Sequence, residues 1–370
     1  MQKEKLVPEI RFKGFNEKWN INALNELINK FDNLRIPVSE KLRTKGEFPY
    51  FGANGIQDYV SGYTHDGEFV LVAEDGANDV NNYPSKYVNG KFWANNHVHV
   101  IQGKENVLDN KFLSFSLKNF DFKPILTGGE RSKLNASALA TIEINKPFIN
   151  EQQKIGAFFS NLDSFIQSQE LKLKKLNEVK QSFLSKMFVS GNQKFPEIRF
   201  KGFEEKWNQK VINQTLIPVI STLTMSNVQR KGEIPLFDAN SIVGYSSYAL
   251  SSVPYLTIIK DGAGVGRIRK LPANSAFLGT MTGLIPRNVD IDFVHSLIST
   301  LSLEKSFSGT TIPHIYFSDY GKLKIYIPDF FEQQKVGQFF SSLDSLIHSQ
   351  EQKLENLNSI KQALLEKMFC

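Results

Sequence analysis

Residues 151–188 read EQQKIGAFFSNLDSFIQSQELKLKKLNEVKQSFLSKMF, and residues 332–369 read EQQKVGQFFSSLDSLIHSQEQKLENLNSIKQALLEKMF. Twenty-five of these 38 positions are identical, at an offset of 181. Neither copy contains an internal proline, and apolar residues recur along both at alternating intervals of four and three. This spacing predicts two long amphipathic helices. A lone helix of this kind cannot bury its apolar seam, so we expect the two to pair antiparallel, with a globular domain at each end.

A shorter copied segment precedes each variable part of the chain. PEIRFKGFNEKWN at residues 8–20 returns as PEIRFKGFEEKWN at residues 196–208, with twelve of thirteen residues identical. The order of arm, variable region and helix therefore occurs twice, which indicates one structural unit used twice, with a pseudo-twofold internal repeat. The predicted parts are a first domain at 1–145 with its arm at 8–20, a central helix at 146–190, a second domain at 191–326 with its arm at 196–208, and a C-terminal helix at 327–370.

The two variable regions are divergent relatives of each other. FVLVAEDGAN at residues 69–78 resembles YLTIIKDGAG at residues 255–264, and both predict a buried strand followed by a turn. Asn89-Gly90 predicts a hairpin, and helices are predicted at 24–31 and 294–303. We therefore expect a mixed α/β fold in each region and an α+β chain as a whole.

Composition excludes several classes of protein. No apolar run reaches the ~18–20 residues that a membrane span needs, and the N-terminus lacks the apolar core of a secretory signal. Cys370 is the only cysteine, which excludes an internal disulfide and a cysteine-based zinc site and is typical of a cytoplasmic protein. The net charge of +6 permits an acidic partner such as nucleic acid.

Catalytic motifs are missing from the sequence. It has no GxxxxGK[ST] phosphate loop and no Pro-Pro pair, hence no NPPY-like methyltransferase motif. DGAGVG at residues 261–266 is interpreted as a turn, because its counterpart at residues 75–79 lacks the later glycines. His97 and His99 share a strand face without a third ligand nearby, so we predict no metal site and no catalytic residue.

The arrangement of copied and divergent parts is that of a two-part reader. The copied parts would hold a scaffold, and the divergent parts would carry specificity. DNA suits such a reader, because a rigid spacer fixes the distance between two half-sites. Candidate DNA-contacting side chains are basic or polar groups in matched loops, since arginine reads guanine and asparagine reads adenine. They are Asn78, Arg131, Lys133 and Asn135 in the first region, and Lys260, Arg267, Arg269, Lys270, Thr311 and His314 in the second.

Charge alone does not make either region a strong DNA binder. The first variable region has 13 basic and 15 acidic residues, and the second has 11 and 7. We therefore expect some phosphate contacts to come from a partner. Paired aromatic residues beside the helical seam, Phe158 with Phe159 and Phe339 with Phe340, are predicted to face a partner or the base of a recognition domain. Packing within the helix pair is the alternative.

The approach to each long helix carries a specific series of residues. It reads NKPFINEQQKIGAFFSNLDSFI at residues 145–166 and YIPDFFEQQKVGQFFSSLDSLI at residues 326–347. With the duplicated PEIRFKGF opening and the repeated order of parts, this series resembles the specificity subunit of type I restriction–modification enzymes over essentially the whole chain. The resemblance implies two α/β target recognition domains joined by two long antiparallel coiled-coil helices.

The resemblance also implies a function and partners. Each domain would read one half of an asymmetric, interrupted site in double-stranded DNA. The helices would act as a ruler and dock two methyltransferase subunits, through which restriction subunits would join. The chain itself would be non-catalytic, and S-adenosylmethionine, ATP and magnesium would belong to the partners.

Two other functions are weighed against this one. A structural coiled-coil adaptor with protein-binding ends would retain no preferred duplex from a randomised pool. A stand-alone methyltransferase or nuclease would bind S-adenosylmethionine as an isolated chain, and the missing motifs argue against it.

Overall fold

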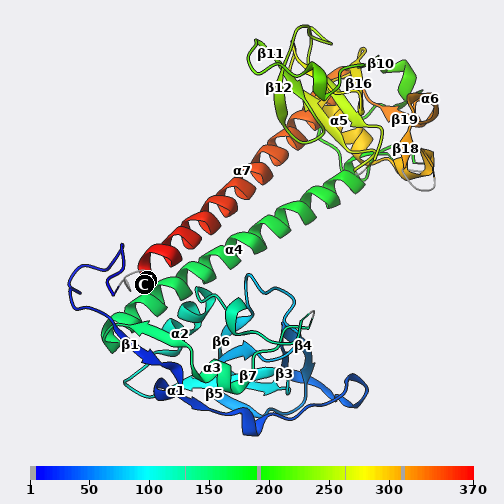
Figure 1. Cartoon of the computed structure of the whole chain (residues 1–370). Coiled ribbons are helices and arrows are strands. Elements are labelled where there is room, and N and C mark those ends of the chain that lie inside the picture. The colour runs from blue at the N-terminus through cyan, green and yellow to red at the C-terminus, as the bar shows by residue number, and fades with distance from the viewer. Residues whose placement is uncertain (1–5, 130, 190–192, 263, 310–312) are drawn as a thin grey trace. The chain divides into compact units, whose positions relative to one another are not determined.

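The chain divides into two compact units, and each of the two long helices contributes residues to both units. The computed structural model describes residues 6–129, 131–189, 193–262, 264–309 and 313–370. Unit 1 comprises Met1–Glu170 and Lys353–Cys370, and unit 2 comprises Leu171–Gln352. The helices α4 (Ile149–Met187) and α7 (Phe330–Met368) each contribute one part to unit 1 and the other part to unit 2 (Figure 1).

Unit 1 is built on a six-stranded sheet with the order β2-β7-β5-β6-β3-β4, and a separate pair, β1 with β8, lies beside it. All pairings in the six-stranded sheet are antiparallel except that of β3 with β6. The elements before α4 are β1 (Asn20–Ala23), α1 (Leu24–Leu27), β2 (Ile28–Lys30), η1 (Asp32–Leu34), η2 (Glu40–Leu42), β3 (Lys45–Gly52), β4 (Gly55–Val60), β5 (His65–Ala73), β6 (Ser85–Ala94), β7 (Val98–Gly103), α2 (Asn110–Lys118), η3 (Lys123–Ile125), α3 (Ala136–Ala140) and β8 (Glu143–Lys146).

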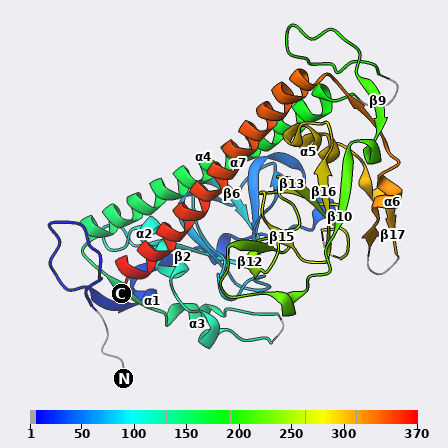
Figure 2. The same cartoon turned by 90° about the horizontal axis from the view of Figure 1, so that it is seen from above.

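Unit 2 repeats this plan with shorter strands. Its β10-β16-β13-β14 sheet corresponds to β2-β7-β5-β6, β9 pairs with β19 as β1 does with β8, and α5 packs on the sheet as α2 does (Figure 2). The elements are β9 (Asn208–Val211), η4 (Ile212–Gln214), β10 (Leu216–Ile220), η5 (Met225–Asn227), β11 (Ile234–Phe237), β12 (Ile242–Ser246), β13 (Tyr255–Ile259), β14 (Ile268–Leu271), β15 (Ala276–Phe277), β16 (Met281–Pro286), α5 (Ile291–Ser299), η6 (Leu303–Ser306), β17 (Phe307–Ser308), β18 (His314–Ile315), α6 (Phe317–Tyr320) and β19 (Lys324–Ile327).

The long helices run antiparallel within each unit. In unit 1 the Lys361 ammonium on α7 lies 2.6 Å from the Asp163 carboxylate on α4. In unit 2 the equivalent ion pair joins Lys180 on α4 to Asp344 on α7 at 2.5 Å. The two pairs are related by the offset of 181, so the copied sequence makes the same interhelical contact twice. The predicted antiparallel pairing is confirmed within each unit.

The copied PEIRFKGF arm fastens both helices of its unit. In unit 1 the Arg11 guanidinium donates two hydrogen bonds of 2.7 Å to the Glu151 carboxylate in the first turn of α4. The neighbouring Ile10 amide donates to the Lys367 carbonyl near the end of α7 at 2.9 Å. Glu151 is 1% exposed, so this pair is buried and bidentate, the geometry in which arginine binds a carboxylate most specifically. The arm therefore holds the start of one helix against the end of the other.

Unit 2 repeats this clasp residue for residue. Arg199 makes the same two 2.7 Å bonds to Glu332 on α7, and the Ile198 amide donates to the Lys186 carbonyl on α4 at 3.0 Å. The arm therefore recurs at an offset of 188 because each unit needs the same arginine and isoleucine contacts to hold its two helices together.

Other residues of the copied helical segment attach each long helix to the globular part of its unit. The Gln152 amide accepts a hydrogen bond from the Asp109 amide and donates to the Pro147 carbonyl. One turn later Gly156 lies against the start of α2, where an added Cβ would stand 2.8 Å from the Phe112 nitrogen. Gln333 and Gly337 repeat both roles against the start of α5. Close approach of the helices therefore requires glycine at this position.

Several local predictions are confirmed and two are wrong. The buried strands predicted at 69–74 and 255–260 are β5 and β13. The helix predicted at 294–303 exists as α5, but it spans Ile291–Ser299 and ends four residues earlier than predicted. The helix predicted at 24–31 ends at Leu27, because the next residues pair with β7 in the sheet. Asn89-Gly90 forms no hairpin but lies inside β6, where Gly90 with φ 98° faces Gly67 with φ 132° across the ladder. Both positions have positive φ values, which glycine adopts without the steric cost that other residues would meet.

None of the helices in the described part of the chain combines the length and the apolar content that a membrane span requires.

Candidate nucleic-acid interface

We call the described residues 127–129 and 131–135 the first reading loop, because they carry side chains predicted to contact DNA. This loop pairs with the turn that follows β5 in unit 1. The Leu134 amide donates to the backbone of that turn at 2.7 Å. Ser132 and Leu134 are buried, whereas the alternate residues Arg131 and Lys133 are exposed. The loop is therefore strand-like, and its register decides which side chains face outward.

Arg131 is an exposed cation of this loop and already has a partner. Its guanidinium donates two hydrogen bonds of 2.8 Å to the Asp75 carboxylate, while its side chain remains 67% exposed. Such a fork can also donate to the O6 and N7 atoms of guanine. Asp75 holds the guanidinium in a fixed orientation without burying it, which suits a group that reads a base edge.

The other predicted residues of the first region lie near this pair. Lys133 forms a backbone bridge with Asp75, and the Asn135 amide lies 3.4 Å from the Thr127 hydroxyl. The Asn78 amide donates to the Asn54 side chain at 2.9 Å, just beyond the same turn. The structure thus gathers all four residues predicted for the first region around one turn.

Unit 2 has the same turn with different side chains. The Gly262 amide donates to the Pro313 carbonyl at 3.2 Å, and the Ile315 amide donates to the Lys260 carbonyl at 2.9 Å. The His314 ring lies 2.7 Å from the Asp261 carboxylate. Asp261 therefore occupies the place of Asp75 and orients a histidine instead of an arginine.

The basic cluster predicted after this turn is divided by the structure. Arg267 donates to the Ala239 carbonyl at 2.6 Å, and the Arg269 guanidinium lies 5.0 Å from the centre of the Phe237 ring. Lys270 instead makes an ion pair with Asp292 on α5. Successive strand residues point to opposite faces of a sheet, so Lys270 is separated from Arg269. Thr311 lies outside the described residues.

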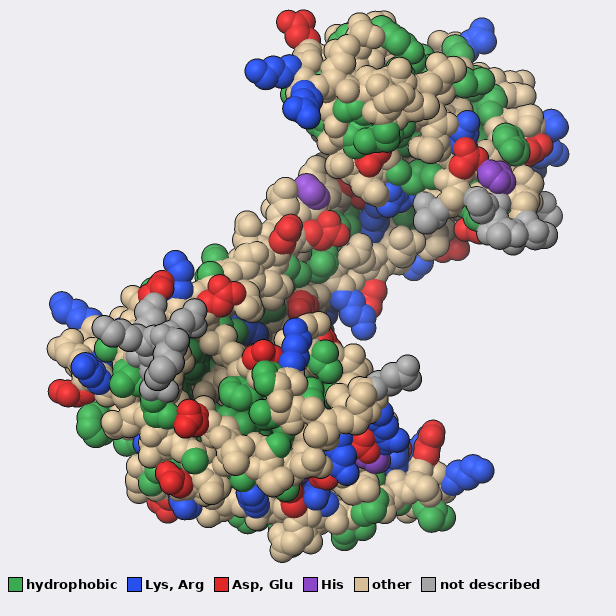
Figure 3. Space-filling model, viewed as in Figure 1, with side chains coloured by type: hydrophobic (Ala, Val, Ile, Leu, Met, Phe, Trp, Pro, Cys, Tyr) green, Lys and Arg blue, Asp and Glu red, His purple; other side chains and the backbone are tan. Residues whose placement is uncertain are grey.

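Charges of both signs surround these loops. On the face that Figure 3 displays, acidic side chains lie among the basic ones in each unit. The near balance of basic and acidic residues in the first variable region likewise indicates a surface without a large excess of positive charge. Fixed pairs such as Arg131 with Asp75, rather than a large basic field, mark the candidate interface.

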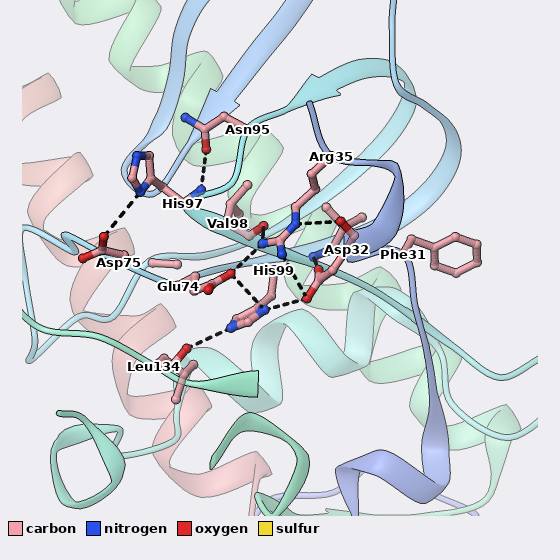
Figure 4. Close-up of polar contacts among 12 residues, drawn as sticks. Phe31, Asp32, Arg35, Glu74, Asp75, Asn95, His97, Val98, His99 and Leu134 are labelled. Carbon is pink, nitrogen blue, oxygen red and sulfur yellow. Dashed lines mark hydrogen bonds and ion pairs between the residues drawn. The ribbon is translucent and has the colours of Figure 1, made fainter. Parts of the chain in front are cut away.

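Beneath the first reading loop lies a polar network around a buried histidine, which the sequence did not reveal. His99 on β7 is 1% exposed, and its Nδ1 lies 2.8 Å from Asp32 and 3.6 Å from Glu74 (Figure 4). The Arg35 guanidinium donates to Glu74 at 2.6 Å and to the Val98 carbonyl at 2.8 Å. These residues lie up to 67 positions apart, so only the fold brings them together.

The network has the donors of a metal site but the charge balance of a salt-bridge cluster. Ligand atoms of Asp32, Glu74 and His99 lie within 4.8 Å of one another. Arg35 lies near both carboxylates, 2.6 Å from Glu74 and 3.6 Å from Asp32, and offsets part of their negative charge. Burial alone would raise the pKa of Asp32, but hydrogen bonds from His99 and from the Val100 amide, with the charges of His99 and Arg35, lower it. The structure therefore favours an ion-pair network at this point.

The paired phenylalanines require a correction. Phe159 and Phe340 are 0% exposed and lie in the cores of their units, so neither can face a partner subunit. Phe159 packs on Phe115 of α2 and on Phe369, and Phe340 packs on Phe188. Their burial agrees with the other predicted location, the base of the recognition domain. Each helix buries its apolar flank against that domain.

Phe158 and Phe339 are half-buried and fix the arms. Phe158 makes an edge contact with Phe12 of the first arm at 5.8 Å between ring centres. Phe339 makes the equivalent contact with Phe200 of the second arm at 6.1 Å. Phe339 also makes an edge contact with Phe183 of α4 at 5.1 Å, which is packing within the helix pair. Phe158 thus contacts its arm, and Phe339 contacts both its arm and the other helix.

Comparison with known proteins accounts for both the repeat and the fold. Residues 16–181 and 192–359 each match the type I restriction modification DNA specificity domain. A Haemophilus influenzae protein named as a type I restriction enzyme specificity subunit is 47% identical over 155 residues, which span 42% of this chain and 40% of that protein. A Mycoplasma pneumoniae protein named as a type I specificity subunit is 24% identical over 82% of each chain.

Solved structures show the same fold. The type I restriction–modification S subunit from M. genitalium superposes with a TM-score of 0.77 at 16% sequence identity, over 98% of this chain and 99% of that one. A structure described in terms of complex assembly and conformational transition of the type I system gives a TM-score of 0.53 at 15% identity over 94% and 97%. Two matched domains on a duplicated scaffold establish that the chain belongs to the family of type I restriction–modification specificity subunits.

Proposed function

We propose that each unit reads one half of an asymmetric, two-part DNA site, and that the chain itself catalyses nothing. The observation that carries this proposal is the pair of equivalent turns. Asp75 orients Arg131 in unit 1, and Asp261 orients His314 in unit 2. Equivalent scaffolds with different reading groups recognise different base sequences, because an arginine and a histidine present different donors.

The proposal assigns catalysis and cofactors to partners. Two methyltransferase subunits would bind S-adenosylmethionine and modify the DNA. Restriction subunits that use ATP and magnesium would join through them. The proposal gains support from the missing catalytic motifs and from the relatives' names as specificity subunits.

Replacing Arg131 by alanine is expected to lower discrimination at one half-site by about 1–3 kcal/mol and to leave the other half-site unchanged. Arg267→Ala is expected to affect only the other half. Competition binding with duplexes altered in either half measures both effects. Lys174→Ala is the matched control, because this exposed lysine on α4 carries the same charge away from the loops. Equal loss of discrimination in both half-sites from either loop variant would contradict the proposal that each unit recognises one half-site.

Two equivalent apolar surfaces on the helices suit two identical partner subunits. In unit 1, Phe165 is 44% exposed and Ile360 is 53% exposed. The Lys353 ammonium lies 5.2 Å from the Phe165 ring, and Ile360 follows two turns later on the same helix face. In unit 2 the equivalent residues, Leu346 and Val179, are 47% and 44% exposed. We infer that each surface docks one methyltransferase subunit.

Replacing Phe165 and Ile360 together by glutamate is expected to reduce binding of the methyltransferase subunit at unit 1 by at least about tenfold, because each buried apolar side chain contributes ~1.5–3 kcal/mol. The mass of the purified complex should fall from two methyltransferase subunits to one. Leu171→Glu is the control, since Leu171 is 54% exposed but lies off this helix face. A complex that keeps both subunits would contradict the assigned surface.

A further inference from the structure

The first reading loop is held from below by one buried histidine. His99 Nε2 lies 2.9 Å from the Leu134 carbonyl oxygen, and His99 Nδ1 lies 2.8 Å from Asp32 (Figure 4). Both partners are acceptors. A neutral imidazole donates from only one nitrogen, so this arrangement is that of a ring that donates from both. His99 on β7 thus ties the reading loop to the sheet through the Leu134 carbonyl, and Asp32 holds the ring in place from the other side.

The groups around His99 fix its orientation. Asp32 also accepts a hydrogen bond from the Val100 amide at 2.7 Å, which holds the carboxylate against the edge of β7. Arg35 bonds Glu74, whose backbone carbonyl in turn accepts from the Leu134 amide. These contacts hold the His99 ring in one orientation. In the network that Figure 4 shows, His99 Nε2 is the group that faces the Leu134 carbonyl oxygen.

The contact controls the part of the loop that would meet DNA. Leu134 is fully buried, and the residues on either side of Ser132 alternate outward as Arg131 and Lys133. Because side chains alternate with a period of two, a slip of one residue would turn Arg131 inward. Fixing the Leu134 carbonyl therefore fixes which residues of the loop face outward.

Among the described residues of unit 2, no histidine occupies the place of His99. In the register of β5 with β7, Val72 lies opposite His99, and in the register of β13 with β16 the equivalent Ile258 lies opposite Thr282. Glu74 is likewise replaced by Lys260. The described backbone of unit 2 keeps the loop pairing without a buried ion-pair network below it.

The geometry points to His99 as a positioning residue that sets the DNA specificity of the first recognition domain. This inference rests on the proposed function. His99 touches no DNA; it acts through the Leu134 carbonyl on Arg131. Its loss relaxes the half-site read by unit 1 and leaves the half-site read by unit 2 intact.

Two substitutions separate the contacts of His99. Asparagine places its amide nitrogen near the position of Nδ1, so His99→Asn keeps the Asp32 contact and loses the Leu134 contact. Glutamine reaches the position of Nε2, so His99→Gln keeps the Leu134 contact. His65→Gln is the matched control, because His65 is 2% exposed in the same sheet and bonds the Phe31 carbonyl rather than the reading loop.

The experiment uses the full chain with its methyltransferase subunits and measures competition binding against duplexes altered in one half of the modified site. His99→Asn is expected to lower discrimination about tenfold in one half, the half that Arg131→Ala affects. The other half should change by less than about twofold, since distant sites act independently. His99→Gln should restore most of the loss, and His65→Gln should leave both halves intact, with melting temperatures recorded for all three.

Equal relaxation by His65→Gln and His99→Asn would overturn the inference, as would His99→Gln behaving like His99→Asn. Should His99→Asn fail to fold, Asp32→Asn takes its place. It keeps the shape of the side chain but weakens the hold on the ring, and it is expected to relax the same half by about threefold; no relaxation overturns the inference. A wild-type complex without any two-part site would instead overturn the proposed function.

Discussion

Replacing Glu151 by alanine is expected to lower the free energy of unfolding of unit 1 by about 3–5 kcal/mol. The substitution leaves the Arg11 guanidinium without its partner in a place where the arginine side chain is only 12% exposed. It also releases the arm that bridges the start of α4 and the end of α7. Hydrogen exchange measured by mass spectrometry should show early loss of protection at the Ile10 amide, which donates to Lys367.

The second unit serves as an internal control in the same molecule. Protection of the Ile198 amide should not change in Glu151→Ala, and it should be lost in Glu332→Ala. Glu178→Ala is the external control, because the Lys174–Glu178 pair is solvent-exposed and such pairs contribute at most about 1 kcal/mol. Full protection of Ile10 in Glu151→Ala would show that the clasp does not hold the helices.

Inserting the same four residues after Gln169 and after Gln350 is expected to lengthen the tolerated gap between the two half-sites. These positions are equivalent at the offset of 181. Four helical residues add ~6 Å to each helix, and a base pair rises ~3.4 Å along DNA, so the preferred gap should grow by about two base pairs. The measurement is binding to a series of duplexes that differ only in the gap.

A one-sided insertion provides the comparison. Four residues added to α4 alone would put its seam out of phase with α7, including the contacts of Asp163 with Lys361 and of Lys180 with Asp344. We expect this variant to lose stability without a new preferred gap. An unchanged gap in the doubly extended chain would contradict the expectation that the helices act as a ruler.

The duplicated scaffold could be predicted from sequence because its contacts are copied with its letters. Arg11 and Glu151 recur as Arg199 and Glu332, and their roles recur with them. Periodicity also predicts the long helices, since apolar residues at intervals of four and three, uninterrupted by proline, are typical of an amphipathic helix. Periodicity did not show that Phe159 belongs to the domain core, because the partner of an apolar flank is set by tertiary packing.

The candidate interface was predictable only in part. Arg131 and Asn78 stand out as polar residues in matched loops, and the structure brings them to one turn. The clustering of Lys270 with its neighbours was misleading, because strand residues alternate between faces. Asp32 and His99 carry no sequence signal of their pairing, since Asp32 begins η1, His99 lies in β7, and only the fold joins them.

The most direct test of the central claim is sequencing of modified bases in cells that carry this chain with its methyltransferase partner. Two unlike recognition domains predict one modified motif, made of two different words separated by a fixed number of unspecified bases. Exchange of residues 209–326 for the corresponding region of a relative should change one word and leave the other. A modified motif that is continuous, or two words that change together after the exchange, would contradict the account.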